Sequence, residues 1–210
     1  MFGSIAKTVG QLLEGAGSVV GYRQGTEEPD HSVEKLTDNV EIRRYGARIA
    51  AETTVKADEV SARNVGFRRL ARYIFGANRD SQKIAMTAPV QQRTGKGADV
   101  ATPTAKVSSD DGDWVIRFFM PADKTLESLP VPDDAEVRLV RLPPETLAVR
   151  RFSGSRSARA IAAQTAELVN TLREHGFKAT DTPAAWFYDP PWTVPPLRRN
   201  EIAVPVERAG

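Results

Sequence analysis

Three arginines share one predicted helix and are suited to binding carboxylates. Arg68, Arg69 and Arg72 lie within residues 58–78, away from the main apolar stripe of that helix. The planar guanidinium group presents paired N–H donors that match the two oxygens of a carboxylate. We therefore interpret these residues as a candidate site for an anionic ligand. The alternative is that the same side chains form only a solvated helix face.

Side chains that could ligate a metal are few in this sequence. There is no cysteine, which excludes disulfides, thiol catalysis and thiolate metal sites. His31 lies in a predicted linker. His175 lies in the last turn of a predicted helix, where a cation interacts favourably with the helix dipole, so we interpret it first as a cap and second as a metal ligand. The remaining groups of this kind are Met86 and Met120, which we expect in the core, and Tyr45, Tyr73 and Tyr188.

The sequence contains no recognised catalytic motif. It lacks HExxH, a Walker-type phosphate loop and GxSxG. Ser153 and Ser155 have no histidine placed to activate them. The aspartates of "SSDDGD" suit a hairpin turn, because the run is too short for an EF-hand loop. The sequence therefore favours a binding protein and leaves enzymatic activity open.

Length and composition favour a globular protein. The chain has 210 residues, a formal charge of +2 and 40% hydrophobic residues. Its basic residues are not concentrated in one run, so we expect no nucleic-acid partner. No apolar run approaches the roughly 20 residues that cross a bilayer, so we expect no transmembrane segment. Together with the absence of cysteine, these features are compatible with the cytoplasm, which is the location we predict.

The first 32 residues are expected to form an amphipathic segment followed by a linker. Apolar residues at helical spacing mark the first part, and "RQGTEEPDHS" marks the second. A helix that docks on the body is the main interpretation, and a weak membrane-surface anchor is the alternative. The apolar residues are Phe2, Ile5, Val9, Leu12 and Leu13.

Residues 33–206 are expected to form a single domain built from two similar halves, at about 37–125 and 135–206. Each half reads as a pair of strands, a helix and a further strand. The short words "IAMTAPV" and "EIAVPV" are matched as the last strands of the two halves. The other aligned positions are Val40, Ile42 and Arg44 with Val137, Leu139 and Arg141, and Ile49 and Ala51 with Leu147 and Val149.

Two amphipathic helices are the firmest local predictions. Each has an apolar stripe at 3–4 spacing and a glycine at its end, Gly76 or Gly176, in a position typical of a C-cap. Such stripes need an apolar surface, which flanking strands supply as a sheet. We predict an α+β fold, a distorted antiparallel β-barrel flanked by two helices. The stripes are Val60, Phe67, Leu70, Ala71 and Ile74, and Ala158, Ile161, Ala162, Thr165, Leu168, Val169 and Leu172.

Two further segments alternate as strands do. In "DWVIRFFM", Trp114, Ile116, Phe118 and Met120 share one face, and residues 95–113 are expected to supply a hairpin partner and a loop. In "KIAMTAPV", a core face is expected to alternate with a small face that either packs under a helix or floors a groove. The core face is Ile84, Met86, Ala88 and Val90, and the small face is Lys83, Ala85, Thr87 and Pro89.

Several of these words together resemble the SOUL haem-binding family. "KIAMTAPV" is similar to its signature strand, "VEIRRYGA" to its opening strand, and "RRFSG" to the strand before its second helix. "YDPPW" followed by "RRNEIAV" is similar to its C-terminal segment. The resemblance covers roughly residues 33–206. It implies the same barrel of two pseudo-symmetric halves and reversible binding of haem or related tetrapyrroles.

The resemblance also bears on individual residues. In the family the position of Arg72 is basic and lies near the proposed groove, so this residue carries over as a partner for a haem propionate. One branch has a histidine in "EIRHYG" as a suggested iron ligand, but here Arg44 occupies that place and cannot ligate iron. Binding is then expected to rest on apolar contact and propionate pairing, and to extend to iron-free porphyrins. The full candidate set is Arg68, Arg69, Arg72, Lys83, Met86 and Tyr188, with His175 as a possible metal ligand.

Three functions stay open at the level of sequence. The first is an intracellular haem or porphyrin carrier. The second is a protein-interaction or other small-molecule-binding module on the same fold. The third is a tetrapyrrole-modifying enzyme. The aromatic run "WFYDPPWTVPP" is expected either to stack on a planar ligand or to plug the end of the barrel.

Overall fold

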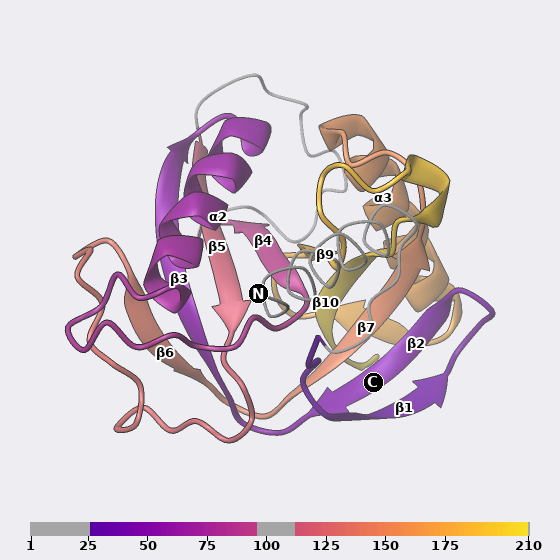
Figure 1. Cartoon of the computed structure of the whole chain (residues 1–210). Coiled ribbons are helices and arrows are strands. Elements are labelled where there is room, and N and C mark those ends of the chain that lie inside the picture. The colour runs from indigo at the N-terminus through magenta and orange to yellow at the C-terminus, as the bar shows by residue number, and fades with distance from the viewer. Residues whose placement is uncertain (1–25, 96–111, 210) are drawn as a thin grey trace, which may run out of the picture.

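The strands form one antiparallel sheet that carries two helices (Figure 1). The computed structural model describes residues 26–95 and 112–209. The predicted N-terminal helix and most of the hairpin partner predicted at 95–113 lie outside these residues. The elements are β1 (His31–Lys35), β2 (Val40–Tyr45), β3 (Arg48–Ala57), α2 (Glu59–Ile74), β4 (Val90–Thr94), β5 (Gly112–Phe119), β6 (Arg138–Leu142), β7 (Glu145–Phe152), α3 (Ala158–Glu174), β8 (Phe177–Ala179), β9 (Ala184–Phe187), the short 3-10 helix η1 (Pro195–Leu197) and β10 (Asn200–Arg208).

Apart from β1 and β8, the strand order is symmetric about the β9–β4 pair. It runs β1-β2-β7-β10-β9-β4-β5-β3-β6, with β8 paired to β10. The series β2-β3-α2-β4-β5 and β6-β7-α3-β9-β10 exchange places when the order is read from the other end, and β4 and β9 meet in the middle. The predicted α+β class with an antiparallel sheet and two flanking helices is confirmed. The described strands do not close a barrel, because β1 and β6, at the two ends of the order, do not pair with each other.

The predicted alignment of the two halves is wrong by one residue at the second strand of each half. Two residues separate β2 from β3, and two separate β6 from β7. Ala50 is therefore the counterpart of Leu147, and both belong to the same cluster, whereas Ile49 packs with the α2 cluster. Since side chains alternate along a strand, the predicted match of Ile49 with Leu147 paired opposite faces of the sheet.

"KIAMTAPV" is not a strand, and this prediction is wrong. Within it only Thr87 forms a bridge, with Glu27, and β4 begins at its last residue. The segment links the end of α2 to β4 and is anchored by single contacts: Ile84 N–H donates to Ile74 O at 2.8 Å, and Thr87 Oγ1 donates to Phe119 O at 2.6 Å. Without a ladder the alternation fails, and Met86, expected in the core, is 42% exposed.

The match of "IAMTAPV" to "EIAVPV" is also wrong. The first word leads into β4, whose counterpart is β9. The second lies in β10, whose counterpart is β5. The likeness of the two words therefore does not reflect equivalent places in the halves.

The first helix packs by a face rotated from the predicted stripe. Val60 and Phe67 are 45% and 37% exposed. The cause is a close approach at Gly66, where an added Cβ would lie 2.3 Å from Ile116 Cγ1 on β5. Asp58 caps the N-terminus by accepting from the backbone N–H groups of Val60 and Ser61. The residues that α2 buries are Ala62, Gly66, Leu70, Tyr73 and Ile74.

The second helix follows its prediction more closely. Ser157 caps its N-terminus, and Leu168 and Leu172 are its buried residues. Gly176 follows its end with a φ of +71°, a left-handed conformation that glycine adopts without strain. Gly76 ends α2 in a similar way, with a φ of +112°. Both glycines stand where the sequence predicts.

Three apolar clusters fill the space around the sheet. One packs α2 on β5 and its neighbours, and one packs α3 on β10 and its neighbours. The third lies on the opposite face and draws residues from strands of both halves, with Trp186 in edge contact with Tyr45 and Phe119 at 5.8 and 5.9 Å. The predicted alternation of "DWVIRFFM" is confirmed, since Ile116 and Phe118 pack under α2 while Phe119 faces the third cluster.

The predicted linker belongs in part to the domain. Glu27 accepts from the Ala122 N–H at 2.6 Å, and Glu28 pairs with Arg199 at 2.7 Å. β1 begins at His31, before the predicted domain boundary. Among the described residues, no helix has both the length and the apolar character needed to cross a membrane.

The Gly66 contact predicts an inverted response to alanine. Alanine normally stabilises a helix interior by about 1 kcal/mol over glycine. Gly66→Ala should instead destabilise the protein by about 1–3 kcal/mol, because the methyl group must displace Ile116. Urea unfolding of this variant beside Asn64→Ala, an exposed position on α2, measures the difference. A Gly66→Ala variant as stable as wild type would refute the close approach.

Candidate ligand-binding site

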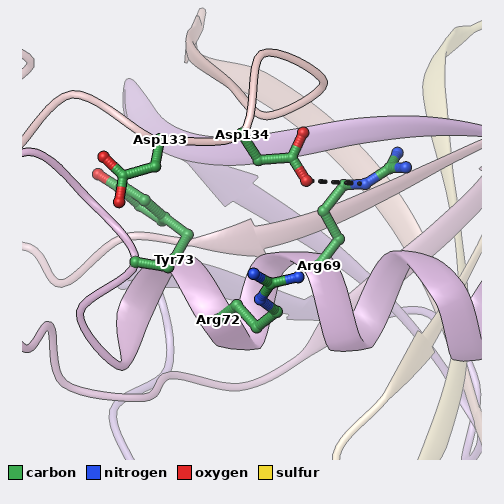
Figure 2. Close-up of a pocket in the computed structure, with 6 residues that line it drawn as sticks. Arg69, Arg72, Tyr73, Asp133 and Asp134 are labelled. Carbon is green, nitrogen blue, oxygen red and sulfur yellow. Dashed lines mark ion pairs between the residues drawn. The ribbon is translucent and has the colours of Figure 1, made fainter.

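A cavity of about 270 Å³ lies beside the C-terminal half of α2 (Figure 2). The helix contributes two of the predicted arginines and a tyrosine, and the loop before β6 contributes two aspartates. Backbone contacts hold helix end and loop together, since the Asp133 N–H donates to Ala77 O and the Arg79 N–H to Val131 O. The lining residues are Arg69, Arg72, Tyr73, Ala77, Asp133 and Asp134.

The two arginines of the cavity differ in what they already bind. Arg69 Nη1 donates to Thr53 Oγ1 at 2.8 Å, and its Nε lies 3.3 Å from Asp134 Oδ2 (Figure 2). The side chain of Arg72 is exposed and makes no hydrogen bond or ion pair with residues 26–95 or 112–209. Arg72 is therefore the guanidinium group of this cavity with donors to offer an anionic ligand.

The aspartates limit the positive charge of the cavity. Asp134 is paired with Arg69, whereas the Asp133 carboxylate has no side-chain partner in the described part of the chain. Two cations and two anions therefore line one space. The site suits a ligand that brings a carboxylate to Arg72 more than one that fills the whole cavity with negative charge.

Tyr73 supplies the one phenol of the cavity, and it is already engaged. Its hydroxyl donates to Pro130 O at 2.9 Å, and burial raises its pKa to about 12. A phenol that stays protonated is a poor metal ligand. Across the described residues there is also no group of three or more His, Cys, Asp or Glu side chains that could hold a metal ion.

The other predicted ligand-binding residues of this region do not line the cavity. Arg68, Lys83 and Met86 are all exposed. Neither Arg68 nor Lys83 forms an ion pair within the described segments. His175 is the C-cap residue that follows α3, and its Nδ1 is 2.9 Å from Thr171 O, in the cap role that the sequence favours.

Tyr188 lies on the opposite face of the sheet from the cavity. Its hydroxyl donates to Glu201 Oε2 at 2.6 Å, and the Arg199 guanidinium lies 3.7 Å from its ring centroid. Burial, with the nearby Glu201 carboxylate, raises the Tyr188 pKa well above its ordinary value. The structure therefore does not bring Tyr188 together with Arg69 and Arg72. In the same aromatic run, Trp186 and Phe187 are buried and Trp192 is 65% exposed.

Glu201 is the centre of that buried charged group. It is fully buried and accepts from Arg43 at 2.8 and 3.0 Å and from Arg199 at 3.0 Å. Burial by itself raises the pKa of this carboxyl, but the hydrogen bond and charge of Arg43 and the charge of Arg199 lower it below the ordinary value. Glu201 is therefore ionised in the folded protein at neutral pH.

Sequence analysis missed a second arginine group, which we name the seam cluster: Arg63, Arg156 and Phe187. The Arg63 and Arg156 guanidinium carbons lie 4.8 and 5.4 Å from the Phe187 ring centroid. These residues come from α2, the segment before α3, and β9. Their separation in sequence leaves no spacing signal that could have joined them. The one available hint was that Arg63 lies on the same helix as the predicted arginines.

Comparison with known proteins gives a family for this arrangement. The family model described as SOUL heme-binding protein matches residues 26–205. Heme-binding protein 2 of Homo sapiens is 31% identical over 137 residues, which is 65% of this chain and 62% of that protein. Heme-binding protein 2 of Mus musculus matches with the same identity and coverage. The match thus spans less than two thirds of the length of these relatives.

Solved structures agree on the fold. The C-terminal domain of EcmrR is similar with a TM-score of 0.59 and 14% identity, over 81% of this chain and 98% of that one. An uncharacterized conserved protein from Listeria innocua has a TM-score of 0.58 and 15% identity, over 80% of this chain and 92% of that one. At such identities the likeness shows the fold alone.

The Glu201 group predicts a measurable acid dependence. Glu201→Gln should destabilise the protein by about 3 kcal/mol at pH 7, because it leaves Arg43 buried beside a neutral amide. Because the carboxyl pKa is lowered from 4.5, its contribution is complete above that pH and is lost as pH falls through the folded value. Urea unfolding of wild type and Glu201→Gln should show that the difference between their free energies of unfolding narrows from pH 7 to pH 3. Glu207→Gln, at an exposed ion pair with Lys178, is the matched control and should cost less than about 1 kcal/mol. A difference in free energy of unfolding that stays constant with pH would contradict the assignment of Glu201 as an ionised partner of Arg43 and Arg199.

Proposed function

This chain belongs to the SOUL haem-binding protein family, and we propose on that basis that it binds haem or a related tetrapyrrole reversibly. The family match over residues 26–205 is the observation that carries the proposal. The names of the similar human and mouse proteins support it. The role we propose is that of a cytoplasmic carrier or buffer.

The cavity beside α2 is the proposed contact for one edge of the ligand. Its volume of about 270 Å³ is below the usual range for sites that enclose a drug-sized molecule, so a macrocycle would enter only in part. Arg72 would pair with a propionate, and Arg69 would stay with Thr53 and Asp134. Phe75 and Val131 are 62% and 50% exposed, and each lies two residues along the chain from a lining residue, so they offer apolar surface for the remainder.

Affinity would come from apolar contact and carboxylate pairing in this proposal. Haem, when bound, supplies a redox-active iron. The only lining residue of a type that ligates haem iron is Tyr73, whose hydroxyl is held by Pro130 and whose pKa is raised to about 12. The protein's own residues would therefore hold the ring and its carboxylates, and an iron-free porphyrin should bind about as well as haem. His175, Arg68, Lys83, Met86 and Tyr188 stay predictions as contacts.

The aspartates of the cavity favour a second candidate, a smaller zwitterionic molecule. Arg72 would bind its carboxylate and Asp133 its cationic group, and the cavity volume fits such a ligand better than a macrocycle. This is the alternative function of a small-molecule-binding module on the same fold. Lack of any response to haem and protoporphyrin would favour it.

The decisive variant for the proposed site is Arg72→Glu. Titration of the full chain with haem, followed by the Soret band, should show binding that Arg72→Glu weakens by about 1–3 kcal/mol, since a charge-assisted hydrogen bond is replaced by repulsion. Protoporphyrin IX should respond in the same way. Arg173→Glu makes the same charge change at an exposed site on α3 and should leave affinity unchanged. Equal affinity of wild type and Arg72→Glu would remove Arg72 from the site, and haem binding far tighter than that of protoporphyrin would reveal an iron ligand.

A further inference from the structure

The seam cluster sits where the two halves of the sheet meet. Phe187 is the last residue of β9 and pairs with Val90, the first residue of β4. In Figure 1, α2 and α3 stand on either side of these two strands. Arg63 comes from α2 and Arg156 from the segment that leads into α3, so one guanidinium group from each half reaches the same buried ring. Phe187 is only 5% exposed, which shows that the ring is covered.

The hydrogen bonds of the two guanidinium groups go to uncharged acceptors. Arg156 donates to Asn200 Oδ1 at 3.1 Å and to Asp189 O at 2.9 Å, which are uncharged acceptors. Arg63 donates to Gln92 Oε1 at 3.5 Å, the long limit of a hydrogen bond. The acidic residues whose charge acts on them are Glu59 for Arg63 and Asp189 for Arg156.

The electrostatics agree with this geometry. Burial, with the nearby Arg198 and Arg63 guanidinium groups, lowers the pKa of Arg156 to about 10, and the Asp189 carboxylate partly offsets this. Burial also lowers the pKa of Arg63, partly offset by Glu59. Both groups are still charged at neutral pH, and the charge of Arg63 disfavours that of Arg156. An anion placed between them would relieve that repulsion.

From the shared ring and the uncharged hydrogen-bond partners, we infer that the seam cluster is an anion-binding site for a carboxylate of a planar ligand. Two forked donors on one aromatic ring suit a carboxylate of a flat molecule and leave the second carboxylate of a tetrapyrrole for Arg72. The site is separate from the α2 cavity, because Arg63 and Arg72 are nine residues apart, or about 13 Å along the helix. The inference rests on the proposed function only in its identification of that ligand as a tetrapyrrole.

A probe that is not a tetrapyrrole tests the site by itself. Benzene-1,4-dicarboxylate added to the full chain should shift the Nε–H NMR signals of Arg63 and Arg156, while that of Arg173 stays in place. Arg63→Gln should weaken this binding about tenfold, as expected for loss of a charge-assisted pair. Arg63→Lys, which keeps the charge but loses the fork, should give an intermediate value. Arg63 is the better residue to replace, because Arg156 also donates hydrogen bonds to the loop carbonyls of Asp189 and Pro190.

A second experiment, which compares the affinities of two porphyrins, identifies the ligand. Protoporphyrin IX should bind more tightly than its dimethyl ester, and Arg63→Gln should reduce that ratio about tenfold if the carboxylates reach the seam. Arg72→Gln should reduce it independently. An unchanged ratio in Arg63→Gln, together with no shift from benzene-1,4-dicarboxylate, would overturn the inference while leaving haem binding intact. Shifts from benzene-1,4-dicarboxylate without any porphyrin binding would sustain the anion site and refute the proposed function.

Discussion

The pairing of β4 with β9 joins the two halves at the centre of the sheet and sets the geometry of the seam. Each helix packs on an apolar cluster, and each cluster takes residues from both halves: Val40 and Ile42 of β2 lie in the α3 cluster, and Val137 lies in the α2 cluster. The halves hydrogen-bond to each other through β2–β7, through β3–β6 and, at the centre of the sheet, through β4–β9, whose register sets Gln91 opposite Trp186. The Trp186 indole N–H donates to Gln91 Oε1 at 3.2 Å across this pair. Since Trp186 also touches Tyr45 and Phe119, the same residue joins the seam to the cluster that both halves share.

The two faces of the sheet have different physical tasks. The face opposite the helices holds the ionised Glu201 with Arg43 and Arg199, and Arg199 in turn pairs with Glu28 of the N-terminal segment. Buried charges in this number are tolerated because they satisfy one another. On the helix-covered face, Arg72 at the cavity has no such partner among the residues that the structure describes, and Arg63 at the seam donates to the uncharged Gln92. Ligand binding is therefore proposed for the helix side, and stability is assigned to the other side.

Sequence patterns were reliable where burial is set by a regular ladder or a long helix. The alternation at 114–120, the caps of both helices and the glycines that end them all follow from local chemistry. The strand prediction for "KIAMTAPV" failed because single hydrogen bonds, one to Ile74 at the end of α2 and one to Phe119 on β5, replace the ladder that alternation assumes. The stripe of α2 was displaced because Gly66, which carries no hydrophobic signal, brings the helix backbone onto Ile116.

The candidate site was only partly predictable for the same reason. Arg69 and Arg72 share one helix turn, so their neighbourhood could be inferred from spacing alone. Asp133 and Asp134, which offset the positive charge of the cavity, lie on a loop about sixty residues later in the chain. The seam cluster needs α2, β9 and the approach to α3 to meet. Such sites depend on the topology of the fold, which short sequence motifs and hydrophobic periodicity do not encode.

The most direct test of the account is the pattern of backbone amide NMR shifts when iron-free protoporphyrin IX is added to the full chain. The account predicts changes along α2 from Arg63 to Ala77 and around Phe187 and Arg156. Changes centred instead on Trp186, Tyr188 and Glu201, on the opposite face of the sheet, would contradict it.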